Sequence, residues 1–457
     1  MKKITRRTIA CLFLSLLLII GTALFIFRFV HDGGDWVAFP SNRHLYSDGV
    51  LSCGRILDRN GEVLAASAED GSSGWTYSSS SSVRRATLHA VGDPKGNIGT
   101  GALSQFADKL TGYNLITGAK TVFSGGRDVY LTIDADVCAA AYDGLNGHNG
   151  TVGVYNYKTG EIICLVSAPG YDPAKSVDLD DPSNDGVLVN RLTQGKFIPG
   201  SIFKLITATA ALENISDIES RTFECTGSLD VDGYHLTCPS AHGKMTFEEA
   251  LNHSCNCTFG SLAVELGSKT MEKYVKQTGL TSRYSVNGIK TTASTFDFES
   301  KGNDGLAWSG IGQGHDQVNP ASMMIFSGAV ANGGKSALPQ IYQHSAFRGG
   351  VRTSIYIKHY TDKLIDSSTA QRLKEMMRTD VLNNYGQSNF PDLEICAKSG
   401  TAQVDGSNAD NAWFTGFLDD DDHPLAFIVN VEGGGSGAKT AGRLANTVLQ
   451  KAIEKGY

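Results

Sequence analysis

The sequence predicts an α+β protein in which an antiparallel sheet packs against helices, preceded by one transmembrane helix and a small, mixed but mainly β, N-terminal region. Two observations carry this fold class. Strand-like segments come in hairpin pairs, at 151–169 and 412–432, and helix-like runs are grouped between them, at 201–213, 246–266 and 319–332. Strands that pair through hairpins form antiparallel sheets, whereas a doubly wound sheet alternates strand and helix.

The length and charge of the chain limit its functional class. The chain has 457 residues, enough for two or three domains and at least one large core. Its net charge is −7, and it contains no long block of Lys and Arg. We therefore expect no nucleic-acid partner.

The first thirty residues predict a membrane anchor. Residues 1–7 carry four basic side chains, and residues 8–27 carry no charge. At about 1.5 Å per residue, such a helix reaches about 30 Å, the thickness of the hydrocarbon layer. Basic residues on the N-terminal side predict a cytoplasmic tail at 1–7, an anchor at 8–30, and the rest of the chain outside. A cleaved signal peptide is the alternative, but its apolar region would be only about 7–15 residues long.

Residues 31–145 form a short region between the anchor and the larger domain. The stretch GRILDRNGEVLAAS (54–67) predicts two short strands joined by a turn. The Ser- and Gly-rich stretch 67–82 predicts a solvated loop. Helical spacing at 99–113 and alternation at 128–134 predict one helix and one strand.

The remaining residues, 146–457, form the larger domain. Its first hairpin turns at Lys158-Thr159-Gly160, and its last hairpin turns at the acidic stretch 419–424. A helix at 442–456 closes the chain. The central helices of this domain and a later strand contain the candidate catalytic and binding residues.

The stretch FIPGSIFKLITATAALE places Ser201 and Lys204 three residues apart at the start of a helix-like run. Residues at this spacing share one face of a helix. Unpaired N–H groups and the helix dipole favour negative charge at a helix start. A serine becomes a nucleophile when a base removes its proton, and burial among apolar residues lowers a lysine pKa so that the lysine can be that base. The pair therefore predicts a nucleophile and its general base.

This spacing alone is weak evidence, because Ser436 and Lys439 repeat it in a Gly-rich loop. The alternative is a serine that caps a helix and a lysine whose charge reaches solvent. Two further polar elements follow in order: Ser254-Cys255-Asn256 and Lys398-Ser399-Gly400-Thr401. The three elements together are the signature of serine enzymes that react with penicillin.

The flanking segments extend this signature. They are RILDRNGEVLA, LTID, YKTGEIICLVSAPGYDP, NRLTQGKFIPGSIFK, TFEEALNHSCN, GIGQGHDQVNPASMM and AWFTGF. In the content and order of these segments, the sequence resembles class B penicillin-binding proteins over about 54–457, most strongly from 128 onward. The resemblance implies a transpeptidase/β-lactamase-like fold at 146–457. It also implies a bacterial, membrane-anchored peptidoglycan D,D-transpeptidase that acts on stem peptides and is inhibited by β-lactams.

The resemblance also implies roles for individual residues. Ser201 attacks the carbonyl of a terminal D-Ala-D-Ala, and Lys204 is its general base. Ser254 relays a proton toward the leaving amine, and Asn256 holds Lys204 and the substrate amide.

The third element supplies the substrate-binding strand. Lys398, Ser399, Gly400 and Thr401 lie along it and receive the substrate carboxylate. The backbone N–H groups of Ser201 and Thr401 form the oxyanion hole. This chain has Lys-Ser-Gly where the family usually has Lys-Thr-Gly; the hydroxyl is kept, so we expect activity to be retained.

The N-terminal region is short for this family. A glycosyltransferase partner in a division or elongation complex is implied. The chain leaves no room for a glycosyltransferase domain of its own. We expect no metal ion and no organic cofactor, since side chains and backbone supply the proton transfer and the oxyanion stabilisation.

The nine cysteines follow no zinc-site spacing, since Cys255 and Cys257 form only a Cys-x-Cys pair. Cys225 and Cys238 flank a hairpin-like loop and are the favoured disulfide pair, with free buried thiols as the equal alternative. Cys255 as a nucleophile is disfavoured because no Cys/His pair is evident. Gln313 is expected in a loop near the cleft.

Two other functions remain open. A D,D-carboxypeptidase, a β-lactamase or a β-lactam sensor would form the same acyl-enzyme but transfer it to water or keep it. A non-catalytic scaffold would keep the fold alone. The intact Ser201 and Lys204 speak against the scaffold, because it has no need of a buried lysine.

Overall fold

The structure is a computed structural model of the whole chain. It describes residues 2–38, 54–67, 74–113, 126–298, 302–347, 350–354, 356–404 and 409–457.

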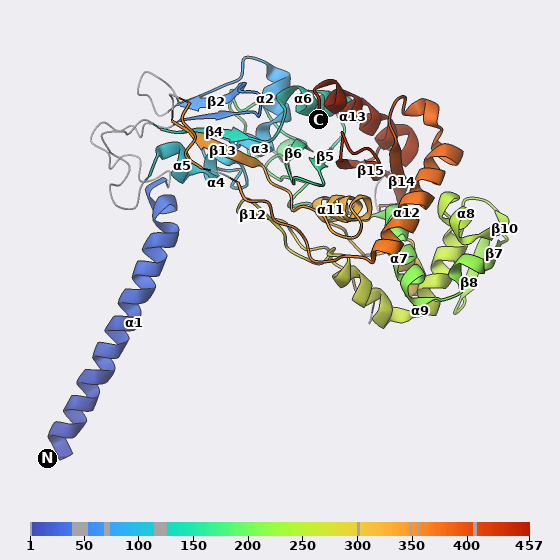
Figure 1. Cartoon of the computed structure of the whole chain (residues 1–457), viewed down its shortest axis with the longest axis horizontal. Helices are drawn as coiled ribbons and strands as arrows, with labels where there is room; N and C mark the ends of the chain where they lie inside the picture. Colours follow the sequence, from blue (N-terminus) through green and yellow to red (C-terminus); the bar gives the residue numbers. More distant parts are fainter. Residues whose placement is uncertain are drawn as a thin grey trace.

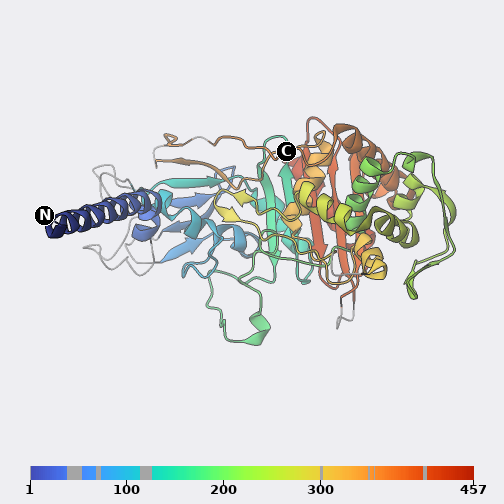
Figure 2. The same ribbon diagram turned by 90° about the horizontal axis from the view of Figure 1, so that it is seen from below.

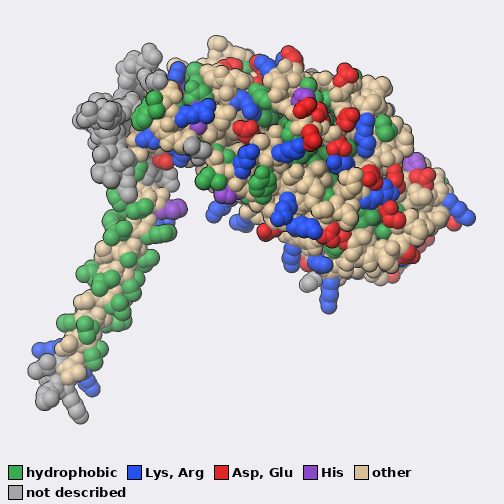
Figure 3. Space-filling model, viewed as in Figure 1, with side chains coloured by type: hydrophobic (Ala, Val, Ile, Leu, Met, Phe, Trp, Pro, Cys, Tyr) green, Lys and Arg blue, Asp and Glu red, His purple; other side chains and the backbone are tan. Residues whose placement is uncertain are grey.

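The first element, α1 (Lys2–Ala38), extends away from the folded body (Figure 1). The most apolar 18-residue window within residues 5–33 has a mean hydropathy of 2.8, and none of this window is buried in the protein. Hydrophobic side chains cover the visible face of this helix (Figure 3). The helix is long and apolar enough to cross a bilayer, and it includes the expected anchor at 8–30.

The larger domain is built on a five-stranded sheet in the order β14-β15-β16-β5-β6. Every neighbouring pair in it is antiparallel, so the predicted fold class is confirmed. Both predicted hairpins, 151–169 and 412–432, form adjacent strands of this sheet. Its strands are β14 (Ile395–Ala402), β15 (Asn411–Leu418), β16 (Leu425–Val431), β5 (Gly150–Asn156) and β6 (Ile162–Ala168).

Helices cover both faces of this sheet. Successive residues of a strand point to opposite faces, so neighbouring residues of β15 contact different helices. On one face, Ser327 of α11 (Pro320–Ala331) hydrogen-bonds Thr415 across 3.0 Å. On the other face, Phe414 lies beneath Gly442, where the π-helix η7 (Gly437–Gly442) passes into α13 (Arg443–Glu454). The helix α6 (Ala135–Gly144) packs against α13 and β6.

A second five-stranded sheet, in the order β13-β4-β1-β2-β3, lies between α1 and the larger domain (Figures 1 and 2). The predicted hairpin at 54–67 forms β1 and β2. Only the β1–β4 pair is parallel. Its strands are β13 (Tyr342–Ala346), β4 (Asp128–Leu131), β1 (Arg55–Leu57), β2 (Val63–Ser67) and β3 (Trp75–Tyr77).

Two expectations for this region are corrected. The stretch 67–82 was expected to be a loop, but its described part contains β3 and the start of α2 (Ser81–Ala86). Trp75 and Tyr77 supply the apolar surface that packs β3 onto the core. The expected helix at 99–113 is two short ones, α4 (Ala102–Gln105) and α5 (Ala107–Thr111), and α3 (Leu88–Val91) precedes them.

The helical part of the larger domain lies beside β14 (Figure 1). The expected helix at 246–266 divides at Ser254 into α8 and α9, and Thr246 with Glu249 forms a capping box at the start of α8. The helices of this part are the 3₁₀ helix η3 (Gly200–Phe203), α7 (Lys204–Asn214), α8 (Phe247–Asn252), α9 (Asn256–Gln277), α10 (Asn303–Gly310), α12 (Ser367–Asp380) and the π-helix η5 (Val381–Tyr385).

Smaller elements complete the fold. Three antiparallel strand pairs are β7 (Thr222–Cys225) with β10 (Gly243–Thr246), β8 (Ser228–Val231) with β9 (Tyr234–Thr237), and β11 (Ser285–Val286) with β12 (Ile289–Lys290). Short 3₁₀ helices are η2 (Pro182–Asn184), η4 (Ile218–Ser220) and η6 (Gln387–Asn389).

Candidate active site

Ser201 lies in η3, which packs directly against strand β14. Gly200 has a φ of +57°, and a Cβ at this position would lie 2.7 Å from the carbonyl oxygen of Thr401. Only glycine tolerates both the left-handed backbone and this close approach. The Gly200 N–H also donates to the carbonyl of Gly312 over 2.8 Å. The turn is therefore fixed on two sides, and Ser201 faces the cavity.

Lys204 begins α7 and is fully buried. Its Nζ lies 3.1 Å from Ser201 Oγ and 3.1 Å from Ser254 Oγ. It also donates to the Ser254 carbonyl (2.5 Å) and to Asn256 Oδ1 (2.7 Å). Burial, followed by the nearby charge of Lys398, lowers the pKa of Lys204 to about 7. A substantial fraction of this amine is therefore neutral near pH 7 and able to accept a proton.

The second polar element sits at the junction of α8 and α9. Ser254 adopts a φ of +51°, which is uncommon for a residue with a side chain. This turn brings its hydroxyl and its carbonyl to the same amine. Asn256 Nδ2 donates to the carbonyl of Thr237 over 2.8 Å, so the amide is oriented with Oδ1 toward Lys204.

Lys398 lies on β14 and is 1% exposed. Its Nζ lies 3.5 Å from Oδ2 of the buried Asp380 and 3.4 Å from the hydroxyl of Tyr385. The Tyr385 hydroxyl donates to Asp380 Oδ2 (2.8 Å) and accepts the Ser399 N–H (2.9 Å). A buried ion pair needs such additional hydrogen bonds to offset desolvation. The contacts with Asp380 and Tyr385 hold the Lys398 amine on the buried side of β14.

The other residues of the third element line or support the cavity. Thr401 is exposed, and its side chain accepts the Gly437 N–H over 3.4 Å. A Cβ at Gly400 would lie 3.0 Å from Ile202 Cγ2, so this glycine permits η3 to approach the strand. Ser399 is half-buried beside Tyr385.

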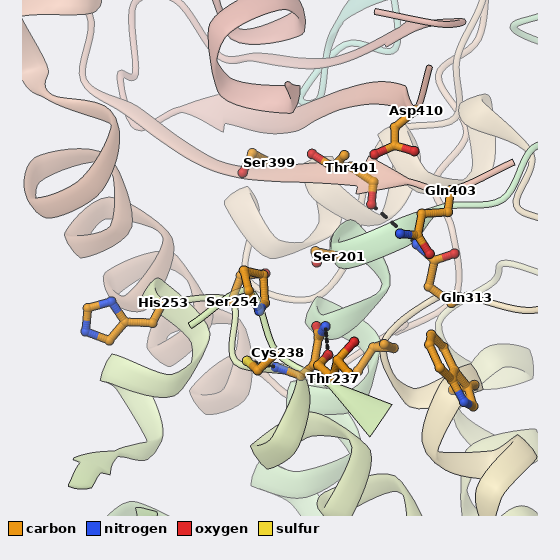
Figure 4. A pocket seen from close by; sticks show the side chains of 14 residues that line it. Ser201, Thr237, Cys238, His253, Ser254, Gln313, Ser399, Thr401, Gln403 and Asp410 are labelled. Atoms are coloured by element: carbon orange, nitrogen blue, oxygen red, sulfur yellow. Dashed lines mark hydrogen bonds between the residues drawn. The ribbon is translucent and has the colours of Figure 1, made fainter. Parts of the chain in front are cut away.

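These residues surround one cavity of about 410 Å³. Figure 4 shows Ser201 between the strand that carries Ser399 and Thr401 and the turn that carries Ser254. Its lining residues are Ser201, Thr237, Cys238, Pro239, His253, Ser254, Asn256, Trp308, Ile311, Gln313, Ser399, Thr401, Gln403 and Asp410. The volume suits a small peptide or drug-sized ligand.

The structure thus brings together all eight residues expected from the sequence. Five of them line the cavity, Lys204 and Lys398 lie buried behind it, and Gly400 supports the Ser201 turn. Gln313 lines the cavity, as expected. The alternative nucleophile, Cys255, is fully buried and is not among the lining residues.

Sequence reasoning missed Asp380 and Tyr385. One signal for Asp380 exists, because an acidic residue at the end of a helix opposes the helix dipole and needs a nearby cation. Asp380 ends α12 and has Lys398 as that cation. Tyr385 lies in a π-helix, and nothing in the local sequence pattern indicates its role.

Of the two alternatives for Cys225 and Cys238, a disulfide or free thiols, the structure has the second, because both residues are free. Cys225 Sγ lies 3.5 Å from Cys257 Sγ, and Cys238 Sγ lies 3.9 Å from Cys255 Sγ. The sequence contains only one Cys-x-Cys pair, which does not by itself indicate a zinc site. The fold brings a second pair to it.

A serine beside a buried lysine, a Ser-x-Asn turn and a Lys-Ser-Gly strand around one cavity define the serine penicillin-recognising class. The comparison with known families agrees. The model of the "penicillin binding protein transpeptidase domain" matches residues 150–454, and the chain belongs to this family.

Curated relatives are similar across most of the chain. Stage V sporulation protein D of Bacillus subtilis is 29% identical over 327 residues, which cover 67% of this chain and 50% of the relative. The peptidoglycan D,D-transpeptidase PbpA of Mycolicibacterium smegmatis is 25% identical over 370 residues, covering 72% of this chain and 73% of that protein. The chain therefore spans half the length of the first relative and about three quarters of the second.

Solved structures share the fold. The D,D-transpeptidase domain of a peptidoglycan glycosyltransferase from Eggerthella lenta has a TM-score of 0.74 at 24% identity, covering 88% of this chain and 98% of that one. Penicillin-binding protein A of M. tuberculosis, solved as an imipenem acyl-enzyme, has a TM-score of 0.75 at 22% identity, with the same coverage of 88% and 98%.

Proposed function

We propose that the protein is a peptidoglycan D,D-transpeptidase that forms an acyl-enzyme on Ser201. The observation that carries this proposal is the Lys204 amine, which is fully buried, has a pKa of about 7 and lies 3.1 Å from Ser201 Oγ. Such an amine can act as a general base near neutral pH. The names of the relatives supply the substrate class.

In the acylation step, Lys204 takes the Ser201 proton as Oγ attacks the carbonyl of the terminal D-Ala-D-Ala peptide bond. The backbone N–H groups of Ser201 and Thr401 stabilise the oxyanion. The proton then passes from Lys204 through Ser254 to the leaving amine, and the last D-Ala departs. The 3.1 Å contact between Lys204 Nζ and Ser254 Oγ supports this relay.

In the second step, an amine of a neighbouring stem peptide attacks the ester. Lys204 accepts the amine proton and passes it to Ser201 Oγ as the ester C–O bond breaks, so that Ser201 is regenerated and a cross-link forms. The substrate carboxylate is received at β14, where Ser399 and Thr401 face the cavity and Lys398 provides positive charge from behind.

The membrane topology belongs to the same proposal. The basic residues before the apolar helix support a cytoplasmic N-terminus and a catalytic domain outside. There the enzyme reaches peptidoglycan, and a glycosyltransferase of a division or elongation complex supplies the glycan strands.

The test is labelling of the full-length chain, purified in detergent, with a fluorescent penicillin. We expect one label per chain, a slowly decaying acyl-enzyme, and peptide mapping to Ser201. Ser201→Ala should abolish the label. Ser436→Ala is the matched control, since it removes the same atom from a second Ser-x-x-Lys stretch and should leave the label intact. A label on another residue would overturn the proposal.

Two further measurements separate the competing functions. Rapid turnover of the β-lactam would identify a β-lactamase, and release of D-Ala without a dimeric product would identify a carboxypeptidase. Complementation of a depleted strain by Ser201→Ala would establish the scaffold. We expect none of these three results.

A further inference from the structure

Four cysteines that the proposed reaction does not use meet beside the cavity. Cys225 ends β7, Cys238 follows β9, and Cys255 and Cys257 stand at the start of α9. All four Sγ atoms lie within 4.8 Å of one another. Cys225, Cys255 and Cys257 are buried, and Cys238 is partly exposed.

The distances between the sulfur atoms fit a single tetrahedral ion. A zinc–sulfur bond of about 2.3 Å corresponds to about 3.8 Å between neighbouring sulfurs of a regular tetrahedron. Two of the separations here are 3.5 Å and 3.9 Å. A disulfide would require about 2.05 Å. The thiols are therefore spaced for a shared ion and not for direct bonds.

The surroundings of the sulfurs resemble those of thiolate ligands. The Asn256 N–H donates to Cys238 Sγ over 3.2 Å, and the Thr258 hydroxyl donates to Cys255 Sγ over 3.4 Å. The Nδ1 atom of His242 lies 3.5 Å from Cys238 Sγ. Hydrogen bonds of this kind orient ligands and spread the negative charge that four thiolates bring to one ion.

We propose that Cys225, Cys238, Cys255 and Cys257 form a structural Zn²⁺ site. Four soft sulfur donors within 4.8 Å of one another select zinc or iron among the common metals, and this close spacing leaves room for one ion only. On binding, the four thiols release their protons to solvent, and neither the sulfur atoms nor the ion changes oxidation state. All four positions are filled by protein, as in structural zinc sites.

The site would hold the second polar element in place. The ligands Cys255 and Cys257 alternate with Ser254 and Asn256, which contact Lys204. The third ligand, Cys238, is adjacent to Thr237, whose carbonyl orients the Asn256 amide. The ion thus ties β7, the β8–β9 hairpin and α9 together at one wall of the cavity. This positioning role rests on the proposed function, whereas metal binding does not.

The first experiment measures the metal content of the full-length protein, purified in detergent without added metal or chelator. We expect about one zinc per chain by elemental mass spectrometry. Cys225→Ser and Cys257→Ser should each lower this content by at least half. Cys164→Ser, which removes a buried thiol on β6 outside the cluster, should leave it unchanged. Iron in place of zinc, or no metal, would overturn the assignment.

A second measurement uses the wild-type chain, so that a variant that fails to fold does not decide the matter. We expect four cysteines to resist alkylation until a chelator removes the ion, and cobalt substitution to give thiolate charge-transfer bands. A mass lower by two hydrogens for each disulfide, with Cys225–Cys257 and Cys238–Cys255 linkages, would overturn the proposal.

The positioning role has its own readout. Removing the ion should slow acylation by a penicillin at saturation, with little change in its initial affinity, and Zn²⁺ but not Mg²⁺ should restore the rate. An unchanged acylation rate in the zinc-free protein would overturn the positioning role, while the metal analysis would still stand.

Discussion

Two stretches of this chain share the pattern Gly-Ser-x-x-Lys, one at 200–204 and one at 435–439, and they differ in nearly every physical respect. Lys204 is fully buried and donates to three residues, whereas Lys439 is exposed. Ser201 faces that amine from within a 3₁₀ helix. Ser436 instead caps a π-helix, its Oγ accepting the Lys439 N–H. The comparison teaches that the spacing brings two side chains together but that burial and neighbouring partners create the chemistry.

The largest expected difference between the stretches concerns the lysines. Lys204→Ala removes the proposed base and should lower the rate of acylation by a penicillin about 10²–10⁴-fold. Lys439→Ala removes an exposed amine and should change the rate by less than twofold. Stopped-flow acylation of both variants, with circular dichroism to verify folding, makes the test. Equal losses in the two would remove the distinction between the stretches.

The pH dependence of acylation sharpens the same point. Lys204 has a pKa of about 7, lowered mainly by burial. Below this pH the amine is protonated and cannot accept the Ser201 proton, so the rate should fall about tenfold per pH unit and reach about 1% of its plateau near pH 5. Above pH 8 it should be constant. A profile whose inflection lies near the ordinary lysine value would indicate a hydrated Lys204 and contradict the proposed base.

The glycines before each serine provide a third contrast. Gly200 and Gly435 have φ values of +57° and +72°, so alanine should cost about 1–2 kcal/mol of backbone strain at either position. At Gly435 nothing lies within 4 Å of the added Cβ, whereas at Gly200 the Thr401 carbonyl lies 2.7 Å away. We expect Gly200→Ala to displace Ser201 from β14 and to reduce acylation at least tenfold.

Gly435→Ala is the matched control for this substitution. It should lower the midpoint of thermal unfolding but leave acylation of the folded protein unchanged. If the two variants lose acylation equally, strain alone is responsible, and the contact between η3 and β14 does not matter.

The sequence predicted what depends on local patterns. The hairpins at β5–β6 and β15–β16 follow from apolar runs separated by turn residues, and the Ser201–Lys204 pair follows from helical spacing. Contacts between distant segments were not predictable in this way. β13, which begins at residue 342, pairs with β4 in the N-terminal sheet. A pairing between strands some two hundred residues apart leaves no signal in the local sequence.

The four cysteines illustrate the same limit at the candidate site. Their separations along the chain match no short metal motif, and it is the β7–β10 and β8–β9 pairs that bring Cys225 and Cys238 to the start of α9. Asp380 and Tyr385 likewise reach Lys398 only because α12 and η5 run alongside β14. Residue types and spacing indicated the nucleophile, while the surroundings that tune it required the fold.

The smallest expected effect concerns thermal stability, to which Ser436 should contribute more than Ser201. Ser436→Ala removes a helix cap, a change that costs about 0.5–2 kcal/mol in general. The cost should be at the low end because the Ser436 Oγ to Lys439 N distance is 3.4 Å. The midpoint of thermal unfolding should fall by no more than about 2–4 °C. Ser201→Ala should leave that midpoint unchanged or raise it, because Lys204 keeps its contacts with Ser254 and Asn256. Differential scanning fluorimetry of the two variants measures both values. A larger fall in the unfolding midpoint for Ser201→Ala than for Ser436→Ala would mean that Ser201 stabilises the fold, as Ser436 does. Ser201 would then not be a residue that the surrounding fold holds in position for reaction.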